Sequence, residues 1–232
     1  MSSNSVNTFF DKKASEAYDE RNSRLSPVSK NLHFLIRLVL DDLPAGSEIL
    51  CVGVGTGEEL IALSEVFPGW HFTGVEPSEP MLEVCRKKIN DRGLTERCNL
   101  VHGYLAEFNE DKRFDAVLCL LVTHFVTDLR ERQAMYTDMY SRLKPGGYLV
   151  NADISDDMES PEFKSMLEKW KALHRFSGAS EQTLEYIEKA MGTQLSVLSK
   201  SKLEELLVKA GFSLPVQFFQ SLLIRAWYSK KG

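Results

Sequence analysis

The feature that most constrains the fold is an alternation of short apolar segments with longer amphipathic ones. The apolar segments have the length of buried strands, and the segments between them repeat their apolar residues at helical spacing. Such alternation is typical of a largely parallel sheet with helices on both faces. The predicted strands are 48–53, 71–76, 98–103, 114–122 and 148–154, and the predicted helices are 27–43, 58–67, 78–90 and 127–143.

The last third of the chain departs from this alternation. Residues 155–200 contain no predicted strand, but two helices are predicted there, at about 160–175 and 181–191. A helix at 200–210 follows, and then two closely joined strands within 215–230, which should pair antiparallel because a parallel pair needs a long crossover. We therefore expect a single domain, 1–232, with an N-terminal cap at 1–26 and a helical lid inserted at 155–200.

Composition and charge make several classes of protein unexpected. The chain has 232 residues, 43% of them hydrophobic and 26% charged, as in ordinary soluble globular proteins. A net charge of −5 argues against a broad nucleic-acid surface, which needs clustered lysine and arginine. The longest apolar run, AVLCLLV, is too short for a membrane span, and neither a signal peptide nor metal-binding cysteine spacing is found. We expect a cytoplasmic monomer or homodimer without a metal, nucleic-acid or membrane partner.

A glycine-spaced segment follows the first predicted strand. Gly53, Gly55 and Gly57 spell G-x-G-x-G, whereas a dinucleotide fingerprint places its third glycine at position 58. Glu58 and Glu59 stand there instead, at the helix N-terminus that receives the diphosphate in dinucleotide sites. Depending on where they point, two carboxylates would repel a diphosphate. The loop thus favours a nucleoside without phosphates over NAD.

An acidic residue ends the second predicted strand. Glu76 lies about 20 residues beyond the glycine loop, where a carboxylate can accept hydrogen bonds from ribose hydroxyls. A nucleoside with a charged amino-acid tail fits the loop and Glu76 together. The glycines alone are also compatible with a plain tight turn.

Four motifs in register resemble those of the class I S-adenosylmethionine-dependent methyltransferases, of the small-molecule type. They are ILCVGVGTG (49–57), GVEPSEPML (74–82), FDAVLCLLVTHFV (114–126) and LKPGGYLVNADI (143–154), and the resemblance extends over about residues 30 to 230. It implies an α/β fold with a Rossmann-like, seven-stranded, mostly parallel sheet, helices on both faces, an antiparallel final strand and a helical lid insert. It also implies S-adenosyl-L-methionine as cofactor and S-adenosyl-L-homocysteine as product.

The resemblance implies roles for individual residues. The backbone of 53–57 would lie under the methionine part of the cofactor, Glu76 would hold the ribose, and Pro77 and Met81 would contact the adenine. Leu120 would end the fourth strand beside the sulfonium. The residues implied to bind the cofactor are Tyr18, Arg21, Gly53, Val54, Gly55, Gly57, Glu76, Pro77, Met81, Tyr104, Leu105 and Leu120.

Two positions depart from the family pattern. Cys51 stands where the family often has an acidic residue at the start of the loop. Tyr104, after Gly103, stands where such enzymes often have an aspartate whose carboxylate meets the adenine amino group. The adenine would then be met by a phenol, a ring face or a backbone group.

The candidate catalytic residues are His124 and Tyr18. His124 follows the fourth strand and is the best candidate general base, because an imidazole accepts a proton near neutral pH. The alternative is a histidine that lines the pocket or caps the next helix. Tyr18 could reach the acceptor or, like Arg21, the methionine carboxylate; alternatively both residues only cover the core.

The predicted lid carries the candidate substrate residues Trp170, His174 and Arg175, in addition to His124. The alternatives are aromatic packing for the first two and a solvated helix-end charge for Arg175. The predicted activity is methyl transfer to a small-molecule acceptor by in-line displacement. Two alternatives stay open, namely an enzyme similar to the carboxy-S-adenosylmethionine synthases and a non-catalytic protein that binds S-adenosylmethionine.

Overall fold

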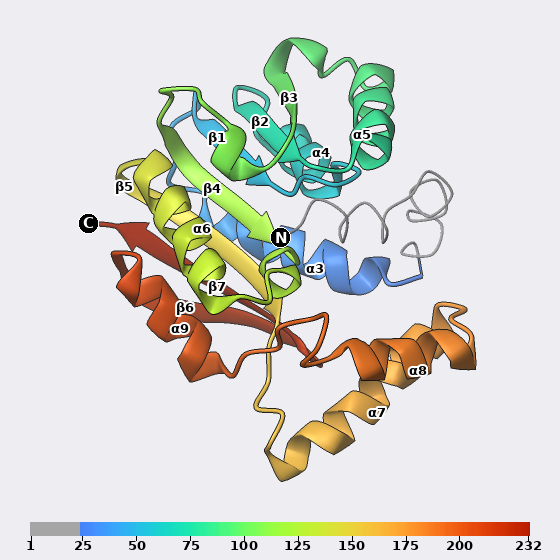
Figure 1. Ribbon diagram of the computed structural model, residues 1–232. Coiled ribbons are helices and arrows are strands. Elements are labelled where there is room, and N and C mark those ends of the chain that lie inside the picture. The colour runs from blue at the N-terminus through green and yellow to red at the C-terminus, as the bar shows by residue number, and fades with distance from the viewer. Residues whose placement is uncertain (1–23) are drawn as a thin grey trace.

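The computed structural model describes residues 24–232, which form a central seven-stranded sheet (Figure 1). The strand order is β3-β2-β1-β4-β5-β7-β6, and β7 runs antiparallel to both of its neighbours while the other pairs are parallel. The predicted fold class is confirmed. The strands are β1 (Glu48–Val52), β2 (His71–Glu76), β3 (Cys98–His102), β4 (Phe114–Leu120), β5 (Leu143–Ile154), β6 (Phe212–Ser221) and β7 (Ile224–Lys231).

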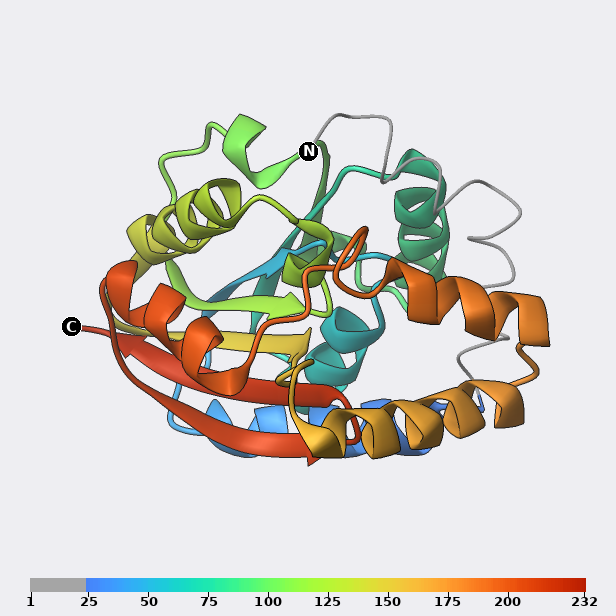
Figure 2. The same cartoon turned by 60° about the horizontal axis from the view of Figure 1, so that its bottom comes forward.

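Helices cover the two faces of the sheet and bury two separate apolar clusters. The first cluster lies under α3 (Ser26–Val39), α4 (Glu58–Val66) and α5 (Glu79–Asp91), and the second lies under α6 (Leu129–Arg142) and α9 (Lys200–Lys209). Figure 2 shows α3 and α6 on opposite sides of the sheet. Three short 3-10 helices, η1 (Thr95–Arg97), η2 (Leu105–Glu107) and η3 (Thr123–Phe125), follow or precede strands. None of the helices within residues 24–232 is long and apolar enough to cross a membrane.

Strand β5 begins earlier than its apolar pattern predicts. The KPGG segment at 144–147 is a turn signal in the sequence, but β5 already starts at Leu143, which pairs with Phe114. The register then shifts, and Tyr148 pairs with Ala116. The glycines form an irregularity inside the strand, with Gly146 at a φ of 75°. A bulge of this kind absorbs the extra residues without ending the pairing.

The helical insert, residues 155–200, leaves the sheet after β5 and returns to it before α9. Its two helices are α7 (Pro161–Phe176) and α8 (Glu181–Ala190), which lie together beyond one end of the sheet (Figure 1). The ends of the insert meet at a bridge between Ser155 and Leu198, where the Ser155 hydroxyl donates to the Leu198 carbonyl at 2.7 Å. Serine N-caps begin both helices, as Ser160 and Ser180 accept from backbone N–H groups three residues on.

Candidate functional site

The glycine loop connects β1 to α4 in a backbone conformation that requires glycine. Gly53, Gly55 and Gly57 have φ values of 69°, 54° and 83°, in the left-handed region. A Cβ atom on Gly53 would lie 2.5 Å from a Val122 methyl carbon, and one on Gly57 would lie 2.6 Å from the Cys85 sulfur. The glycines therefore allow close approach of the loop to the rest of the chain. The same lack of side chains leaves the loop's outer surface as open backbone.

Glu76, at the end of β2, holds the glycine loop through hydrogen bonds. Its Oε2 accepts the N–H of Gly55 and its Oε1 accepts the N–H of Ser78, both at 2.9 Å. Burial raises the pKa of Glu76, and these two hydrogen bonds act in the opposite direction. Carboxylate oxygens have several lone pairs, so Glu76 can accept a ligand hydroxyl as well.

The two residues expected at the adenine border this carboxylate. Met81, on α5, is buried, and its methyl carbon would be 3.5 Å from a Cβ placed on Gly55. Pro77 is half-buried, and its carbonyl accepts from Nε2 of His102 at 3.1 Å. Met81 therefore lies beside the glycine loop, and Pro77 directly follows Glu76 in the chain.

The two glutamates at the start of α4 point in different directions. Glu58 is exposed and forms an ion pair with Lys88 of α5. Glu59 is half-buried, and burial raises its pKa to about 8. At neutral pH one carboxylate is thus neutralised by a lysine and the other is largely protonated. The predicted repulsion of a diphosphate by two free charges is not what the structure contains.

Cys51 fills the place of the family's acidic residue with an apolar contact. Its side chain is fully buried in the first apolar cluster, and it pairs with Gly74 of β2 and Leu118 of β4. Burial, followed by the nearby Glu59 carboxyl, raises the pKa of Cys51 well above its ordinary value. The residue is a protonated core thiol.

Tyr104 lies directly after β3, at the end of the sheet that carries the glycine loop. The preceding Gly103 donates its N–H to the backbone carbonyl of Glu76 at 3.0 Å, and the N–H of Tyr104 donates to Glu107 Oε2 at 2.9 Å. The Tyr104 hydroxyl is buried without a hydrogen-bond partner among the described residues. Leu105 points elsewhere, into the second apolar cluster.

His124 belongs to a buried polar network that joins η3, α6 and β5. Its Nδ1 lies 2.6 Å from Oδ1 of Asp153, and its backbone N–H donates to the same oxygen at 3.1 Å. The other oxygen, Oδ2, accepts from the guanidinium of Arg132 and from the Thr123 hydroxyl. The Thr123 hydroxyl also contacts the Tyr136 hydroxyl at 2.9 Å. His124, Asp153 and Arg132 are all buried.

Asp153 carries the negative charge of this network. Burial works to raise its pKa, but the Arg132 guanidinium and the hydrogen bonds from His124 and Thr123 outweigh burial, so the pKa lies below its ordinary value. An ionised Asp153 can only accept a hydrogen bond, so Nδ1 of His124 carries the ring proton and donates to Asp153. Nε2 is then the acceptor nitrogen of the imidazole. The structure gives Nε2 no hydrogen-bond partner among residues 24–232. Nε2 is therefore the ring nitrogen that can accept a hydrogen bond.

The chain is turned sharply where β4 ends and this network begins. Leu120, expected beside the sulfonium, is half-buried at the end of β4, and the next residue, Leu121, has a φ of 59°. A non-glycine residue in the left-handed region costs roughly 1 kcal/mol. The turn sets Val122 against Gly53 and directs His124 toward Asp153.

The expected substrate residues of the insert have different surroundings. Trp170 is buried in the first apolar cluster, and His174 is half-buried with its ring edge-on to Trp170 at 4.7 Å. Arg175 is exposed and pairs with Glu181 at 2.7 Å, as a solvated helix-end charge would. Tyr18 and Arg21 lie outside the described residues, as does most of the predicted cap at 1–26. The structure brings His124 and the loop residues to one end of the sheet, but not Arg175.

Sequence reasoning missed Asp153, Arg132, Thr123 and Tyr136. A signal for Asp153 was present, since it is a charged residue at the carboxyl end of an otherwise apolar strand, where parallel sheets gather functional side chains. For Arg132 there was none, because charged residues on a helix normally face solvent. No group of three or more metal-ligating side chains is found within residues 24–232.

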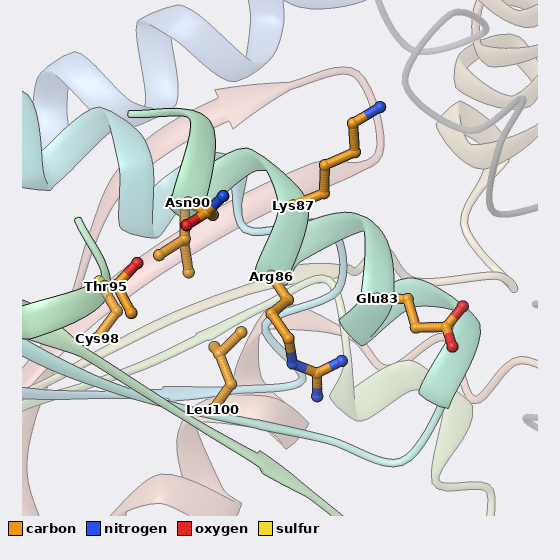
Figure 3. Close-up of a pocket in the computed structure, with 8 residues that line it drawn as sticks. Glu83, Arg86, Lys87, Asn90, Thr95, Cys98 and Leu100 are labelled. Carbon is orange, nitrogen blue, oxygen red and sulfur yellow. The ribbon is translucent and has the colours of Figure 1, made fainter. Parts of the chain in front are cut away.

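A separate pocket of about 660 Å³ lies between α5 and β3 (Figure 3). Its lining includes Arg86, Asn90 and Leu100, and none of the described residues expected to bind the cofactor takes part. The pocket is therefore not the site formed by the loop, Glu76 and His124.

The loop and its neighbours fit a nucleoside with an amino-acid tail. Three glycines form the cradle, and Glu76 offers a carboxylate at the end of the next strand, β2. Tyr104, after β3, offers a hydroxyl that has no hydrogen-bond partner in the part of the chain that the structure describes. A family model described as a methyltransferase domain matches residues 49–147 of the chain. A demethylmenaquinone methyltransferase from Listeria welshimeri is 30% identical over 219 residues, covering 87% of this chain and 85% of the relative.

This chain belongs to the class I S-adenosylmethionine-dependent methyltransferases. A carboxy-S-adenosyl-L-methionine synthase from Campylobacter hominis is 26% identical to it over 232 residues, covering 96% of this chain and 94% of the relative. An O-methyltransferase family protein from Burkholderia thailandensis has the same fold, with a TM-score of 0.68 and 17% identity. That alignment covers 95% of this methyltransferase but 60% of the longer solved chain. The methyltransferase uses S-adenosylmethionine as its cofactor.

Proposed function

We propose that this methyltransferase transfers a methyl group to a hydroxyl group of an apolar small molecule, with His124 as general base. The observation that carries the proposal is the contact between His124 Nδ1 and the buried carboxylate of Asp153 at 2.6 Å. A carboxylate in this position fixes the ring orientation and the tautomer, so that Nε2 faces away as an acceptor. S-Adenosylmethionine supplies an electrophilic methyl carbon when bound, and its C–S bond breaks as the bond to the acceptor oxygen forms.

The protein's own task is to position the acceptor and to take its proton. His124 Nε2 accepts the hydroxyl proton, and Asp153 stabilises the imidazolium that results. Arg132 keeps Asp153 ionised, as the lowered pKa of that carboxyl indicates. The glycine loop, Glu76, Pro77, Met81 and Tyr104 hold the cofactor in this proposal, with Leu120 beside the reacting carbon.

The chemistry of the insert supports an apolar acceptor. The residues of the insert that pack toward the sheet include Met158, Met166 and Trp170, in the same cluster as Leu120 and Leu121. Methionine side chains are adaptable and make favourable contacts with aromatic rings. By contrast, two cations of the insert, Lys171 and Arg175, pair with glutamates of the insert. We propose that the insert acts as a lid over a ring-bearing acceptor.

The test is a methyl-transfer assay with radiolabelled S-adenosylmethionine and two panels of acceptors, hydroxylated aromatic compounds and aliphatic carboxylic acids. Turnover should be confined to the first panel. His124→Gln should lower kcat by about 10²–10⁴-fold, with S-adenosylhomocysteine affinity nearly unchanged. The matched control is His71→Gln, because His71 is an exposed histidine at the start of β2, whereas Glu76 and the proposed site lie at the end of that strand. Turnover of the acids alone, or a wild-type kcat for His124→Gln, would refute the proposal.

A second candidate is an activity like that of the carboxy-S-adenosylmethionine synthases, which the similarity over 96% of the chain favours. Such an enzyme has to hold one more carboxylate near the sulfonium, and a cation is the natural partner. Arg132 and Arg225 are already paired with Asp153 and Asp156. Mass spectrometry of the cofactor that copurifies with the protein separates the two activities, since a carboxylated cofactor would support only this candidate.

A further inference from the structure

The hydroxyl of Tyr104 has no hydrogen-bond partner within residues 24–232, and its surroundings indicate which ligand group it binds. The following inference rests on the proposed cofactor site. The strand order β1, β2, β3 places three features side by side at the carboxyl ends of neighbouring strands, namely the glycine loop, Glu76 and Tyr104. Neighbouring strands are about 4.8 Å apart, so a ligand that reaches from the end of β1 past β2 to the end of β3 spans about 10 Å. With the methionine part on the loop and the ribose at Glu76, the base lies at Tyr104.

The backbone of Tyr104 is already engaged. Its N–H donates to Glu107 Oε2 at 2.9 Å, and its carbonyl accepts the N–H of Glu107 at 2.9 Å. Gly103 is tied to Glu76 through its own N–H. The backbone N–H of Tyr104 is therefore not available to the base. Of the three groups expected to contact the adenine, this leaves the phenol hydroxyl and the ring face.

The hydroxyl, in contrast, is buried and unpaired among the described residues. Burial and the nearby carboxyl groups of Glu107 and Glu76 raise the pKa of Tyr104, so the phenol keeps its proton. A neutral hydroxyl is one donor and two acceptor sites, and its hydrogen rotates to suit the partner. A buried hydroxyl without a partner is unfavourable, and a ligand atom in hydrogen-bond reach would remove that cost.

We propose that the Tyr104 hydroxyl binds the purine at its 6-position and makes the cofactor site nearly indifferent between a 6-amino and a 6-oxo purine. An ionised aspartate at this position accepts only, so it binds the adenine amino group and repels a carbonyl oxygen. The phenol accepts from the amino group of adenine and donates to the carbonyl of hypoxanthine. Tyr104 thus sets the base selectivity of this methyltransferase.

The experiment is calorimetry of the full chain with S-adenosyl-L-homocysteine and with its 6-oxo analogue, S-inosyl-L-homocysteine. The wild-type protein should bind the two with Kd values within about threefold of each other. Tyr104→Asp should bind the inosine compound at least about tenfold more weakly than the adenosine compound, and Tyr104→Phe should weaken both by about 5–10-fold, the range of one lost hydrogen bond. The control is Tyr148→Phe, which removes a tyrosine hydroxyl from β5. That hydroxyl donates to Asp42 at 2.8 Å, so its loss should change neither Kd.

Each outcome has a distinct meaning. If Tyr104→Phe binds both compounds as tightly as wild type while remaining folded by circular dichroism, the hydroxyl does not contact the base. If wild type disfavours the inosine compound as strongly as Tyr104→Asp does, the selectivity argument is wrong. In both cases the proposed function survives, because S-adenosylhomocysteine still binds. If wild type binds neither compound, the proposed function fails and this inference fails with it.

Discussion

Replacing Asp153 by asparagine removes the charge at the centre of the buried network while keeping the side-chain shape. Asp153 is fully buried and accepts from five groups, namely the ring and backbone nitrogens of His124, the hydroxyl of Thr123, the guanidinium of Arg132 and the N–H of Ile154. An asparagine has one acceptor oxygen and an NH₂ group that would face these donors. Arg132, which is also fully buried, would lose its counter-ion.

The expected cost follows from that stranded charge. Removing one partner of a buried ion pair costs about 3–5 kcal/mol, because the remaining charge stays in a poorly polarisable interior. The Arg132 Nε atom already has no hydrogen-bond partner within residues 24–232, so few neighbouring groups could replace the lost carboxylate as a hydrogen-bond acceptor. Besides Asp153, the guanidinium donates to the Ser196 carbonyl at 2.9 Å. We therefore expect Asp153→Asn to lower the free energy of unfolding by about 3–5 kcal/mol at pH 7.

Urea unfolding followed by tryptophan fluorescence measures this loss, since Trp70, Trp170 and Trp227 are all buried. The double variant Arg132→Met, Asp153→Asn removes both charges and should recover most of the stability. A pH series adds a second check. The lowered pKa of Asp153 means that its charge stabilises the fold above the unfolded-state pKa and that this contribution is lost as pH falls through the folded-state pKa. The gap between wild type and Asp153→Asn should therefore narrow in acid.

Two results would refute the reasoning. One is a loss below about 1 kcal/mol for Asp153→Asn, which would mean that Arg132 is solvated or re-paired at little cost. The other is a double variant that is less stable than Asp153→Asn alone, which would mean that packing and not charge governs this site.

Three further predictions concern the glycine loop. Glu76→Gln presents an NH₂ group where the carboxylate accepted the Gly55 N–H, so S-adenosylhomocysteine affinity should fall by about 10–100-fold in calorimetry, and an unchanged Kd would show that Glu76 does not hold the cofactor. Gly53→Ala sets a Cβ 2.5 Å from a methyl carbon of Val122 at a φ of 69° and should cost about 1–3 kcal/mol in urea unfolding; an unchanged midpoint would contradict the packing argument. Glu59, with its pKa raised from 4.5 to about 8, holds in the folded state a proton that the unfolded chain releases, so stability falls as pH rises through that window. Glu59→Gln should match wild type in thermal unfolding at pH 4 and exceed it at pH 9, and an equal difference at both pH values would show that Glu59 does not ionise in this range.

The architecture could be predicted from the sequence because each element carries its own periodic signal. Strands such as β1 and β4 are continuous apolar runs, and the helices between them repeat apolar residues on one face. One exception is the start of β5. There the KPGG segment predicts a turn, yet the pairing of Leu143 with Phe114 extends the strand through it. Local turn chemistry was overridden by a pairing partner about thirty residues away along the chain, which no local signal encodes.

The glutamates after the loop show how a correct prediction can rest on an incomplete physical reason. Glu58 and Glu59 were expected to repel a diphosphate as free charges. In the structure Lys88 neutralises Glu58, and burial keeps Glu59 largely protonated at neutral pH. The assignment to the methyltransferase family stands on the register of its motifs and on its relatives. The direction of a side chain depends on which helix packs beside it, and that is decided by tertiary contacts.

The sequence by itself determined the glycine loop, the acidic residue after β2 and the histidine after β4, because each is a local feature at the end of a predicted strand. Only the tertiary structure decided what these residues contact. Asp153 lies 29 positions from His124 along the chain, and Arg132 would ordinarily be read as a surface residue of α6. They meet because β4 and β5 are neighbours in a parallel sheet and α6 packs across both. Burial then holds Asp153 and Arg132 together, since ionised groups removed from water are stable only when paired.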